Sequence, residues 1–231
     1  MTVPSGLKHF YLAAPLAPGL IVPLPVPLQR RLQQVLRLAV GAKIGLFNGQ
    51  DGLWEAALGP APGQATVVAL RQAQPTPLPL TLLLAGLKRE AFETALRQAT
   101  ELGVQAIQPV LTAYAQRSQF NPERARAIII EAAEQCERLS LPQLADFIPL
   151  EQAVAAHSNI FWAAERLPAA PAPASSAALA VLVGPEGGFA PAEKVWLQAQ
   201  PQVRVASLGA TILRADTAVV AALTQAKLAL G

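Results

Sequence analysis

Two short glycine-containing segments hold the residues best suited to chemistry. The first, Val183–Phe189, reads Val-Gly-Pro-Glu-Gly-Gly-Phe and places the carboxylate of Glu186 among three glycines. The second, Ser207–Ala218, reads Ser-Leu-Gly-Ala-Thr-Ile-Leu-Arg-Ala-Asp-Thr-Ala and places Arg214 after an apolar Ile-Leu pair. Glycine lets backbone amides and carbonyls approach a ligand without interference from a Cβ atom. Each segment is therefore a candidate binding loop, although neither matches the dinucleotide or P-loop fingerprint.

Each segment lies between an expected strand and an expected helix. The apolar run Ala177–Val183 predicts a buried strand, and Pro191 suits the first turn of the helix that follows. Val203–Leu208 predicts the last strand and Thr217–Leu230 the last helix. Ligands of open α/β sheets bind at the carboxyl ends of strands. We therefore expect the two loops to face one another at the same edge of a sheet.

Ordinary structural roles also explain these residues when each segment is taken singly. A lone glycine-rich pentapeptide most often does no more than link a strand to a helix. Arg214 could form a salt bridge with Asp216 or Glu186, and the apolar residues of the second segment could belong to a core. The pairing of the two segments, rather than either alone, carries the functional interpretation.

The chain from residue 80 onwards alternates between strand and helix patterns. We expect strands at 80–86, 104–111 and 159–164, helices at 90–102 and 122–139, and a Pro/Ala/Ser-rich surface loop at 167–176. Alternation of this kind is typical of an α/β domain with a mostly parallel sheet.

The N-terminal third has a different pattern, dominated by short strands. We expect strands at 43–47, 53–58 and 65–70 with Asn-Gly and Asp-Gly turns between the first two, and one helix at 29–40. This pattern predicts a small β-barrel. Three prolines between residues 74 and 79 predict a stiff linker. The sequence thus divides into a domain at 1–73 and a domain at 80–231.

Composition excludes several classes of protein. Hydrophobic residues make up 52% of the 231 residues and charged residues 14%, which is too apolar for a disordered chain. A single cysteine, Cys136, rules out a disulfide within the chain, and with only two histidines we expect no metal site. The uncharged stretch 10–28 contains five prolines, so it predicts no membrane helix. We expect a cytoplasmic protein that does not bind membranes.

Positive charge is concentrated at the N-terminus. Residues 1–75 hold six basic and two acidic side chains, whereas residues 76–231 hold 12 basic and 13 acidic ones. A basic module joined to a nearly neutral one indicates an anionic partner for the first. A solvated basic surface is the alternative explanation.

Taken together, the motifs resemble those of the RsmE family, the 16S rRNA uridine-N3 methyltransferases of the SPOUT class. The resemblance rests on Gly-Pro-Glu-Gly-Gly-Phe at 184–189 and Ser-Leu-Gly-x-x-Ile-Leu-Arg-x-x-Thr-Ala at 207–218. Glu-Leu-Gly-Val at 101–104, Glu-Ala-Ala-Glu-Gln at 131–135 and Phe-Asn-Gly at 47–49 are also similar to family segments. The similarity spans nearly the whole chain.

The resemblance implies a PUA-like RNA-binding β-barrel followed by a SPOUT α/β domain with a parallel sheet and a trefoil knot. It implies S-adenosylmethionine as cofactor, a homodimer, and 16S rRNA within the 30S ribosomal subunit as partner. The implied reaction is methylation of N3 of a specific uridine. A guanidinium near the uracil carbonyl oxygens would stabilise the negative charge that develops when N3 loses its proton.

Specific residues take roles under this resemblance. Arg214 and Glu186 are the expected catalytic residues, with Glu186 either accepting a proton or, as we favour, orienting its neighbours. The expected cofactor-binding residues are Val183, Gly184, Pro185, Gly187, Gly188, Ser207, Leu208, Gly209, Ile212, Leu213 and Ala218. The expected RNA-binding residues are Lys8, His9, Arg30, Arg31, Arg37, Arg117 and Arg138.

The chain departs from the family pattern at a few positions. His9 and Ser140 stand where the family has arginines, Ala210-Thr211 replaces a Pro-Arg pair, and Asp216 replaces a glutamate. The loss of the two arginines at positions 9 and 140 bears on RNA contacts and leaves the cofactor loops untouched. Two alternatives therefore stay open: a SPOUT methyltransferase that acts on another RNA, and a non-catalytic RNA-binding factor in ribosome assembly.

Overall fold

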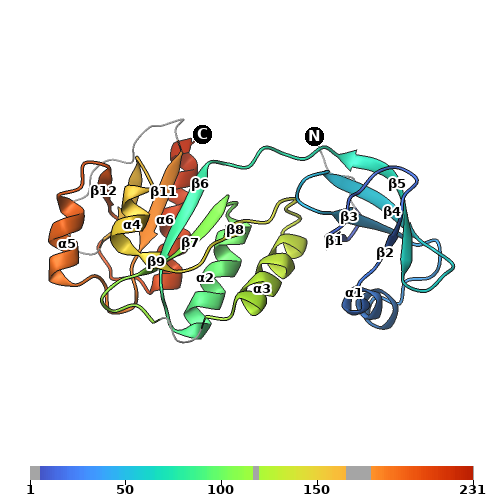
Figure 1. The fold of residues 1–231 in the computed structure, drawn as a ribbon, viewed down its shortest axis with the longest axis horizontal. Coiled ribbons are helices and arrows are strands. Elements are labelled where there is room, and N and C mark those ends of the chain that lie inside the picture. The colour runs from blue at the N-terminus through green and yellow to red at the C-terminus, as the bar shows by residue number, and fades with distance from the viewer. Residues whose placement is uncertain (1–5, 117–119, 165–177, 231) are drawn as a thin grey trace. The chain divides into compact units, whose positions relative to one another are not determined.

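The computed structural model describes residues 6–116, 120–164 and 178–230 (Figure 1). Arg117 and the loop expected at 167–176 lie outside the described residues. The chain divides into two compact units, the first formed by Met1–Thr76 with Ala133–Leu141 and the second by Pro77–Ala132 with Pro142–Gly231. The grouping of residues 133–141 with the N-terminal unit differs from the expected division at a single linker between 73 and 80.

The N-terminal unit is built on a five-stranded sheet with the order β1-β3-β4-β5-β2. β1 runs parallel to β3, and the other neighbours are antiparallel. Among the described residues the edge strands β1 and β2 do not pair, so the sheet is a curled half-barrel rather than a closed barrel. The strands are His9–Tyr11 (β1), Ile21–Pro23 (β2), Lys43–Phe47 (β3), Leu53–Leu58 (β4) and Gln64–Gln72 (β5).

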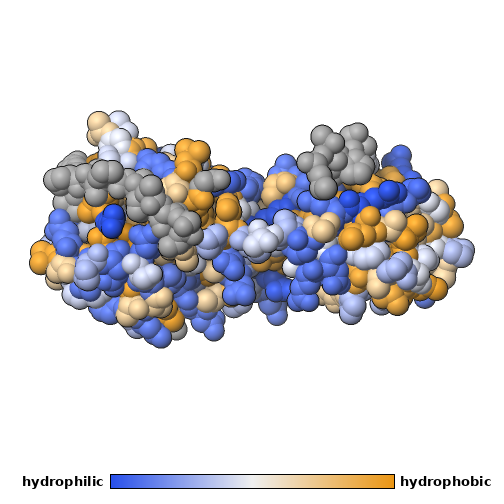
Figure 2. Space-filling model, turned by 90° about the horizontal axis from the view of Figure 1, so that it is seen from above, coloured by the Kyte–Doolittle hydropathy of each residue, from blue (hydrophilic) through white to orange (hydrophobic). Residues whose placement is uncertain are grey.

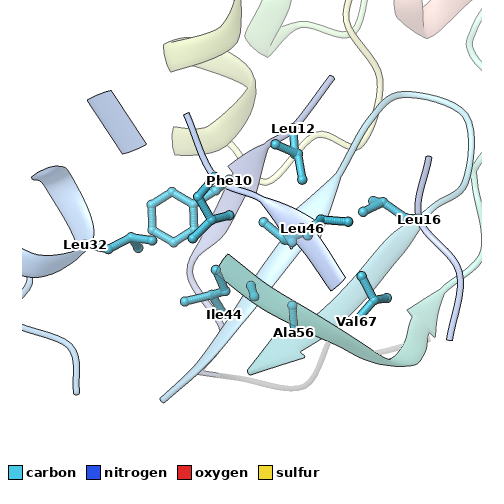
Figure 3. Packing of buried hydrophobic residues seen from close by; sticks show 11 residues of the cluster. Phe10, Leu12, Leu16, Leu32, Ile44, Leu46, Ala56 and Val67 are labelled. Carbon is cyan, nitrogen blue, oxygen red and sulfur yellow. The ribbon is translucent and has the colours of Figure 1, made fainter. Parts of the chain in front are cut away.

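Alternating apolar residues of these strands form the core of the N-terminal unit. Phe10, Ile44, Leu46 and Val67 are almost completely buried and point toward one another between the strands (Figure 3). Leu32, from the helical segment beside the sheet, is also fully buried against this cluster. Burying a side chain of this size stabilises a fold by about 1.5–3 kcal/mol.

The predicted bounds of the helix at residues 29–40 are wrong at both ends. The structure has an α-helix at Val26–Arg30 (α1), which continues as a wider π-helical turn at Arg31–Val35 (η1). The start is earlier because proline is tolerated in the first helical turn. The end is earlier because Arg37 adopts a positive φ of 52°, which lets the Leu38 N–H donate to the Leu32 carbonyl across the helix terminus.

The C-terminal unit contains a seven-stranded parallel sheet with helices packed against it (Figure 1). The strand order is β12-β10-β11-β6-β7-β8, with β9 paired to β7. The strands are Leu80–Ala85 (β6), Ala106–Leu111 (β7), Gln143–Leu144 (β8), Ile148–Pro149 (β9), Ile160–Ala163 (β10), Leu179–Val183 (β11) and Val203–Ala206 (β12). The helices are Arg89–Glu101 (α2), Pro122–Gln135 (α3), Leu150–Ala155 (α4), Pro191–Gln198 (α5) and Ala215–Leu230 (α6). The short elements β8, β9 and α4 were not predicted, and α3 ends earlier than expected.

Helix packing explains why the central strands are apolar throughout. All five residues of β11 are buried, because α4 and α5 supply Leu150, Val154 and Leu197 to a cluster with Leu182 and α6 also packs on the sheet. No helix among the described residues is long and apolar enough to span a membrane. On the face shown in Figure 2, polar and apolar residues are interspersed over each unit.

Candidate functional site

The carboxyl ends of four neighbouring strands lie level at one edge of the parallel sheet. Val183 of β11 pairs in register with Ala163 of β10 and Leu84 of β6, and Ala163 pairs with Ala206 of β12. The loops that follow these strands therefore emerge side by side. The two segments identified in the sequence follow β11 and β12, with β10 between them, so they flank the end of one strand.

A cavity of about 880 Å3 opens at this edge. Its size lies within the roughly 300–1,000 Å3 range of small-molecule sites. Of the thirteen residues expected to hold the cofactor or act in catalysis, twelve line it and Gly187 does not. The twelve are Val183, Gly184, Pro185, Glu186, Gly188, Ser207, Leu208, Gly209, Ile212, Leu213, Arg214 and Ala218.

Residues 184–188, here called the glycine turn, are shaped by close packing. A Cβ atom on Gly184 would lie 2.6 Å from the ring of Phe189, which is itself buried against Trp162. The turn is closed by a 2.8 Å hydrogen bond from the Gly188 N–H to the Pro185 carbonyl, and Gly188 has a φ of 70°. The glycines at 184 and 188 are therefore required by the backbone and its neighbours.

The Glu186 side chain is exposed but already accepts a hydrogen bond from the backbone. Its Oε1 accepts a hydrogen bond of 3.1 Å from the backbone N–H of Lys88, the residue that precedes α2. An orphan N–H group at a helix N-terminus is a favourable partner for a carboxylate. The bond connects the glycine turn to α2, the helix that forms another wall of the cavity.

Glu193, which does not itself line the cavity, holds the helix that follows the glycine turn. Its Oε2 accepts from the Ala190 N–H at 2.8 Å and its Oε1 from the Ala113 N–H at 2.7 Å. One carboxylate thus closes the first turn of α5 and ties that helix to the loop after β7.

Residues 207–214, here called the arginine loop, have fewer contacts. Six of its eight residues are exposed, among them Ile212 at 55% and Arg214. Its hydrogen bonds within the described chain join the Gly209 N–H to Ser207 Oγ, the Gln225 side chain to the Ser207 carbonyl, and the Ala218 N–H to the Arg214 carbonyl. None of the ion pairs between described residues involves Arg214, so neither Asp216 nor Glu186 neutralises it.

Sequence reasoning missed the contribution of α2 and β10 to the cavity. From α2 and the residue before it, the cavity is lined by Lys88, Glu90, Ala91 and Thr94, and from the end of β10 by Ala163 and Ala164. Lys194 of α5 adds a cation. The lining then holds three carboxylates, Glu90, Glu186 and Asp216, against three cations, Lys88, Lys194 and Arg214, so it is balanced in charge.

Another side of α2, which does not line this cavity, is held by an ionic cluster. Arg124 of α3 and Arg89 donate hydrogen bonds to Glu93 and lower the pKa of its carboxyl to about 2. Glu93 therefore stays charged across the physiological pH range and links α2 to α3.

No group of three or more His, Cys, Asp or Glu side chains among the described residues could hold a metal ion.

The expected RNA-binding residues divide into three groups. Lys8, Arg30 and Arg37 are exposed on the N-terminal unit. Arg31 is exposed but pairs with Glu134 and stacks over the Phe10 ring. Arg138 is partly buried, which lowers the pKa of its guanidinium, and its Nε–H donates to Ser140 Oγ.

The structure contradicts the expected RNA-binding role of His9. Its side chain is only 4% exposed, in β1, so a phosphate could not reach it. Burial also lowers the pKa of its imidazole, although the charge of Glu137 acts in the other direction. A neutral buried ring is a poor partner for an anion. The burial of His9 could not be predicted from local sequence, because a histidine beside Lys8 fits a basic surface equally well.

Comparison with known proteins gives two matching domain families. Residues 74–227 match an RNA methyltransferase domain, and residues 32–70 match an RNA methyltransferase PUA domain. A ribosomal RNA small subunit methyltransferase E from Rickettsia conorii is 32% identical over 207 residues, which cover 85% of each chain. The protein of that name from Synechocystis is 35% identical over 208 residues, or 84% of this chain and 68% of the relative.

A solved structure has the same fold along nearly the whole chain. It is a ribosomal RNA small subunit methyltransferase E from Neisseria gonorrhoeae bound to S-adenosyl methionine. The identity is 28%, the TM-score 0.81, and the match covers 95% of this chain and 96% of that one.

Proposed function

The chain belongs to the ribosomal RNA small subunit methyltransferase E family, and on this premise we propose that it methylates N3 of a specific uridine in 16S rRNA. Membership makes it an RNA methyltransferase with an N-terminal PUA domain. The observation that carries the finer proposal is the cavity at the carboxyl sheet edge, which is framed by the glycine turn and the arginine loop together.

The cavity suits S-adenosylmethionine, the group bound by the Neisseria gonorrhoeae relative. Gly184, Gly188 and Gly209 bring backbone to its surface without Cβ atoms, and Leu208 and Leu213 offer half-buried apolar side chains for an adenine ring. When bound, the cofactor supplies a methyl group activated by its sulfonium centre. The chain's own task is then to hold donor and acceptor in line and to stabilise charge on the acceptor.

Arg214 is suited to the stabilising role. Uridine N3 carries a proton at neutral pH, and negative charge spreads onto the uracil carbonyl oxygens as that proton leaves. Arg214 lines the cavity, and its guanidinium has no carboxylate partner among the described residues, so its five N–H donors are available to those oxygens.

Glu186 is better suited to a positioning role. Its Oε1 already accepts the Lys88 N–H, which fixes the glycine turn relative to α2. A general base needs a lone pair directed at the acceptor nitrogen, and because Oε1 is directed at a helix terminus, only Oε2 is left for that task. The hydrogen bond thus supports the orienting role over proton acceptance.

The N-terminal unit is proposed to hold the RNA backbone. Lys8, Arg30 and Arg37 expose cations that can contact phosphates, and Arg31 offers a guanidinium whose charge is partly balanced by Glu134. The substrate is then 16S rRNA within the 30S subunit, and the enzyme acts in the cytoplasm where ribosomes assemble.

Two features of the proposal rest on the family resemblance alone. These are a homodimer with the site near the subunit interface and a trefoil knot in the C-terminal domain. For the dimer, we expect sedimentation equilibrium to give twice the chain mass of 24.2 kDa, and a single-chain mass would remove it. For the knot, we expect an experimental structure that traces the whole domain to show the chain threaded through a loop, and an unthreaded chain would remove it.

The proposal is tested by methyl transfer from labelled S-adenosylmethionine to 30S subunits isolated from a strain that lacks this modification. Nucleoside analysis should give 3-methyluridine at one position of 16S rRNA. Label on another RNA or base would instead favour a different substrate. Cofactor binding without any transfer would favour the non-catalytic assembly factor.

A further inference from the structure

Gly187 has a neighbour that the cofactor interpretation does not explain. It is the one residue of the glycine turn that does not line the cavity. A Cβ atom built on it would instead lie 3.5 Å from the Cβ of Tyr114 and 3.6 Å from its Cδ2. One side of the glycine turn therefore faces the cavity, and another packs on the Tyr114 side chain.

Tyr114 is held in place by its backbone neighbours. It follows β7 in the loop at the carboxyl edge of the sheet, beside the end of β6. The Ala113 N–H donates to Glu193 of α5 at 2.7 Å, and the Ala115 N–H donates to the Thr112 carbonyl at 3.1 Å. The Gln116 N–H donates to the Gly86 carbonyl at 2.8 Å, so the loop is anchored on both sides of the tyrosine.

The Tyr114 side chain is nevertheless 51% exposed. A large aromatic residue on an anchored loop loses little conformational entropy when a ligand covers it. Unpaired RNA bases are recognised by stacking on such rings together with hydrogen bonds to their edges. Uridine N3 lies on the base-pairing edge, so an enzyme reaches it only in an unpaired base, whose neighbours are then free to stack. Tyr114 does not line the cavity itself, so the base that it suits is not the one being methylated.

We propose that Tyr114 binds RNA by stacking on the base of a nucleotide that flanks the methylated uridine. This inference rests on the proposed function, since it takes RNA to be the substrate at this edge of the sheet. The glycine turn lies against this tyrosine at Gly187, where even an added Cβ atom would make only ordinary van der Waals contact with it.

Three variants separate stacking from structural support. Tyr114→Ala keeps the Cβ atom, which is the nearest contact to Gly187, and removes the ring. Tyr114→Phe keeps the ring and removes the hydroxyl. Val195→Ala, at a residue of α5 that is 68% exposed and does not line the cavity, is the matched control for loss of an exposed apolar side chain.

The readouts are affinity for unmodified 30S subunits by filter binding, affinity for S-adenosylmethionine by calorimetry, and kcat and KM for methyl transfer. We expect Tyr114→Ala to weaken 30S binding at least about fivefold, with unchanged cofactor affinity. Tyr114→Phe and Val195→Ala should match the wild type. Wild-type affinity in Tyr114→Ala, or equal losses in Tyr114→Phe and Tyr114→Ala, would overturn stacking.

A crosslinking experiment keeps the inference testable if Tyr114→Ala does not fold. A photoreactive benzoyl-phenylalanine is placed at position 114 or, as control, at position 195, and the protein is irradiated with unmodified 30S subunits. Crosslinks to 16S rRNA from position 114 alone are expected, and their absence would overturn the proposal. Failure of the proposed function gives a different result. In that case the wild-type protein transfers no methyl group to 30S subunits, whether or not position 114 crosslinks to RNA.

Discussion

The glycine turn after β11 and the arginine loop after β12 frame the same cavity but are fixed to very different degrees. The glycine turn contacts α2 through Glu186 and the loop after β7 through Gly187, and it ends on the buried Phe189. The arginine loop is mostly exposed, and its hydrogen bonds in the described chain involve only its first three residues and its last.

This difference indicates that the two loops have different roles, the glycine turn as a preformed wall of the cavity and the arginine loop as the part that adapts to the ligand. A wall that is fixed before the ligand arrives lowers the entropic cost of binding and keeps backbone groups in place. A loop with few internal contacts has low local stability and can rearrange around a ligand. We therefore expect substitutions in the glycine turn to affect folding stability, and substitutions in the arginine loop to affect activity with little effect on stability.

The largest expected effect is on the stability of the glycine turn. Gly184→Ala would place a methyl group 2.6 Å from the Phe189 ring, which Trp162 prevents from moving freely. Overpacking of this kind lowers the free energy of unfolding by about 1–3 kcal/mol. Denaturant unfolding of the variant and the wild type measures this difference in the free energy of unfolding.

Gly187→Ala is the matched control for that experiment. Its new Cβ atom would meet Tyr114 at 3.5 Å, an ordinary contact, and Gly187 has no positive φ. We expect stability equal to the wild type or slightly higher, because alanine restricts the unfolded chain. Equal losses in the two variants would show that packing against Phe189 does not fix the turn.

The next effect is on catalysis, from the arginine loop. Arg214→Ala should lower kcat for methyl transfer at least tenfold, about 1.4 kcal/mol of barrier, and leave the unfolding midpoint and cofactor affinity unchanged. Arg204→Ala, which removes an exposed arginine of β12 outside the cavity, should leave both activity and stability unchanged. Full activity in Arg214→Ala would remove this residue from the mechanism, and a stability loss would contradict the division between the loops.

Local sequence patterns predicted the loops but not all that surrounds them. The run at 177–183 predicted β11, because buried parallel strands are continuously apolar. The segment at 203–208 predicted β12, which is an edge strand and includes the exposed Arg204. The position of β10 between them could not be predicted, since strand order depends on pairing between distant segments. The same limit hid Lys88 and Glu90, which reach the cavity only because β6 lies next to β11.

The N-terminal unit shows a second kind of limit. The grouping of residues 133–141 with the half-barrel depends on Glu134, which accepts from the Tyr11 N–H and pairs with Arg31. These partners are more than a hundred residues apart in sequence. The early end of η1 depends on a positive φ at Arg37, a residue type that gives no signal for it.

The most direct test of the division between the loops is hydrogen–deuterium exchange with and without S-adenosylmethionine. In the free protein we expect slow exchange at the glycine turn and fast exchange across residues 207–214. Adding the cofactor should slow exchange strongly in the arginine loop and change the glycine turn little. Protection of neither loop, or equally fast exchange of both in the free protein, would contradict the account.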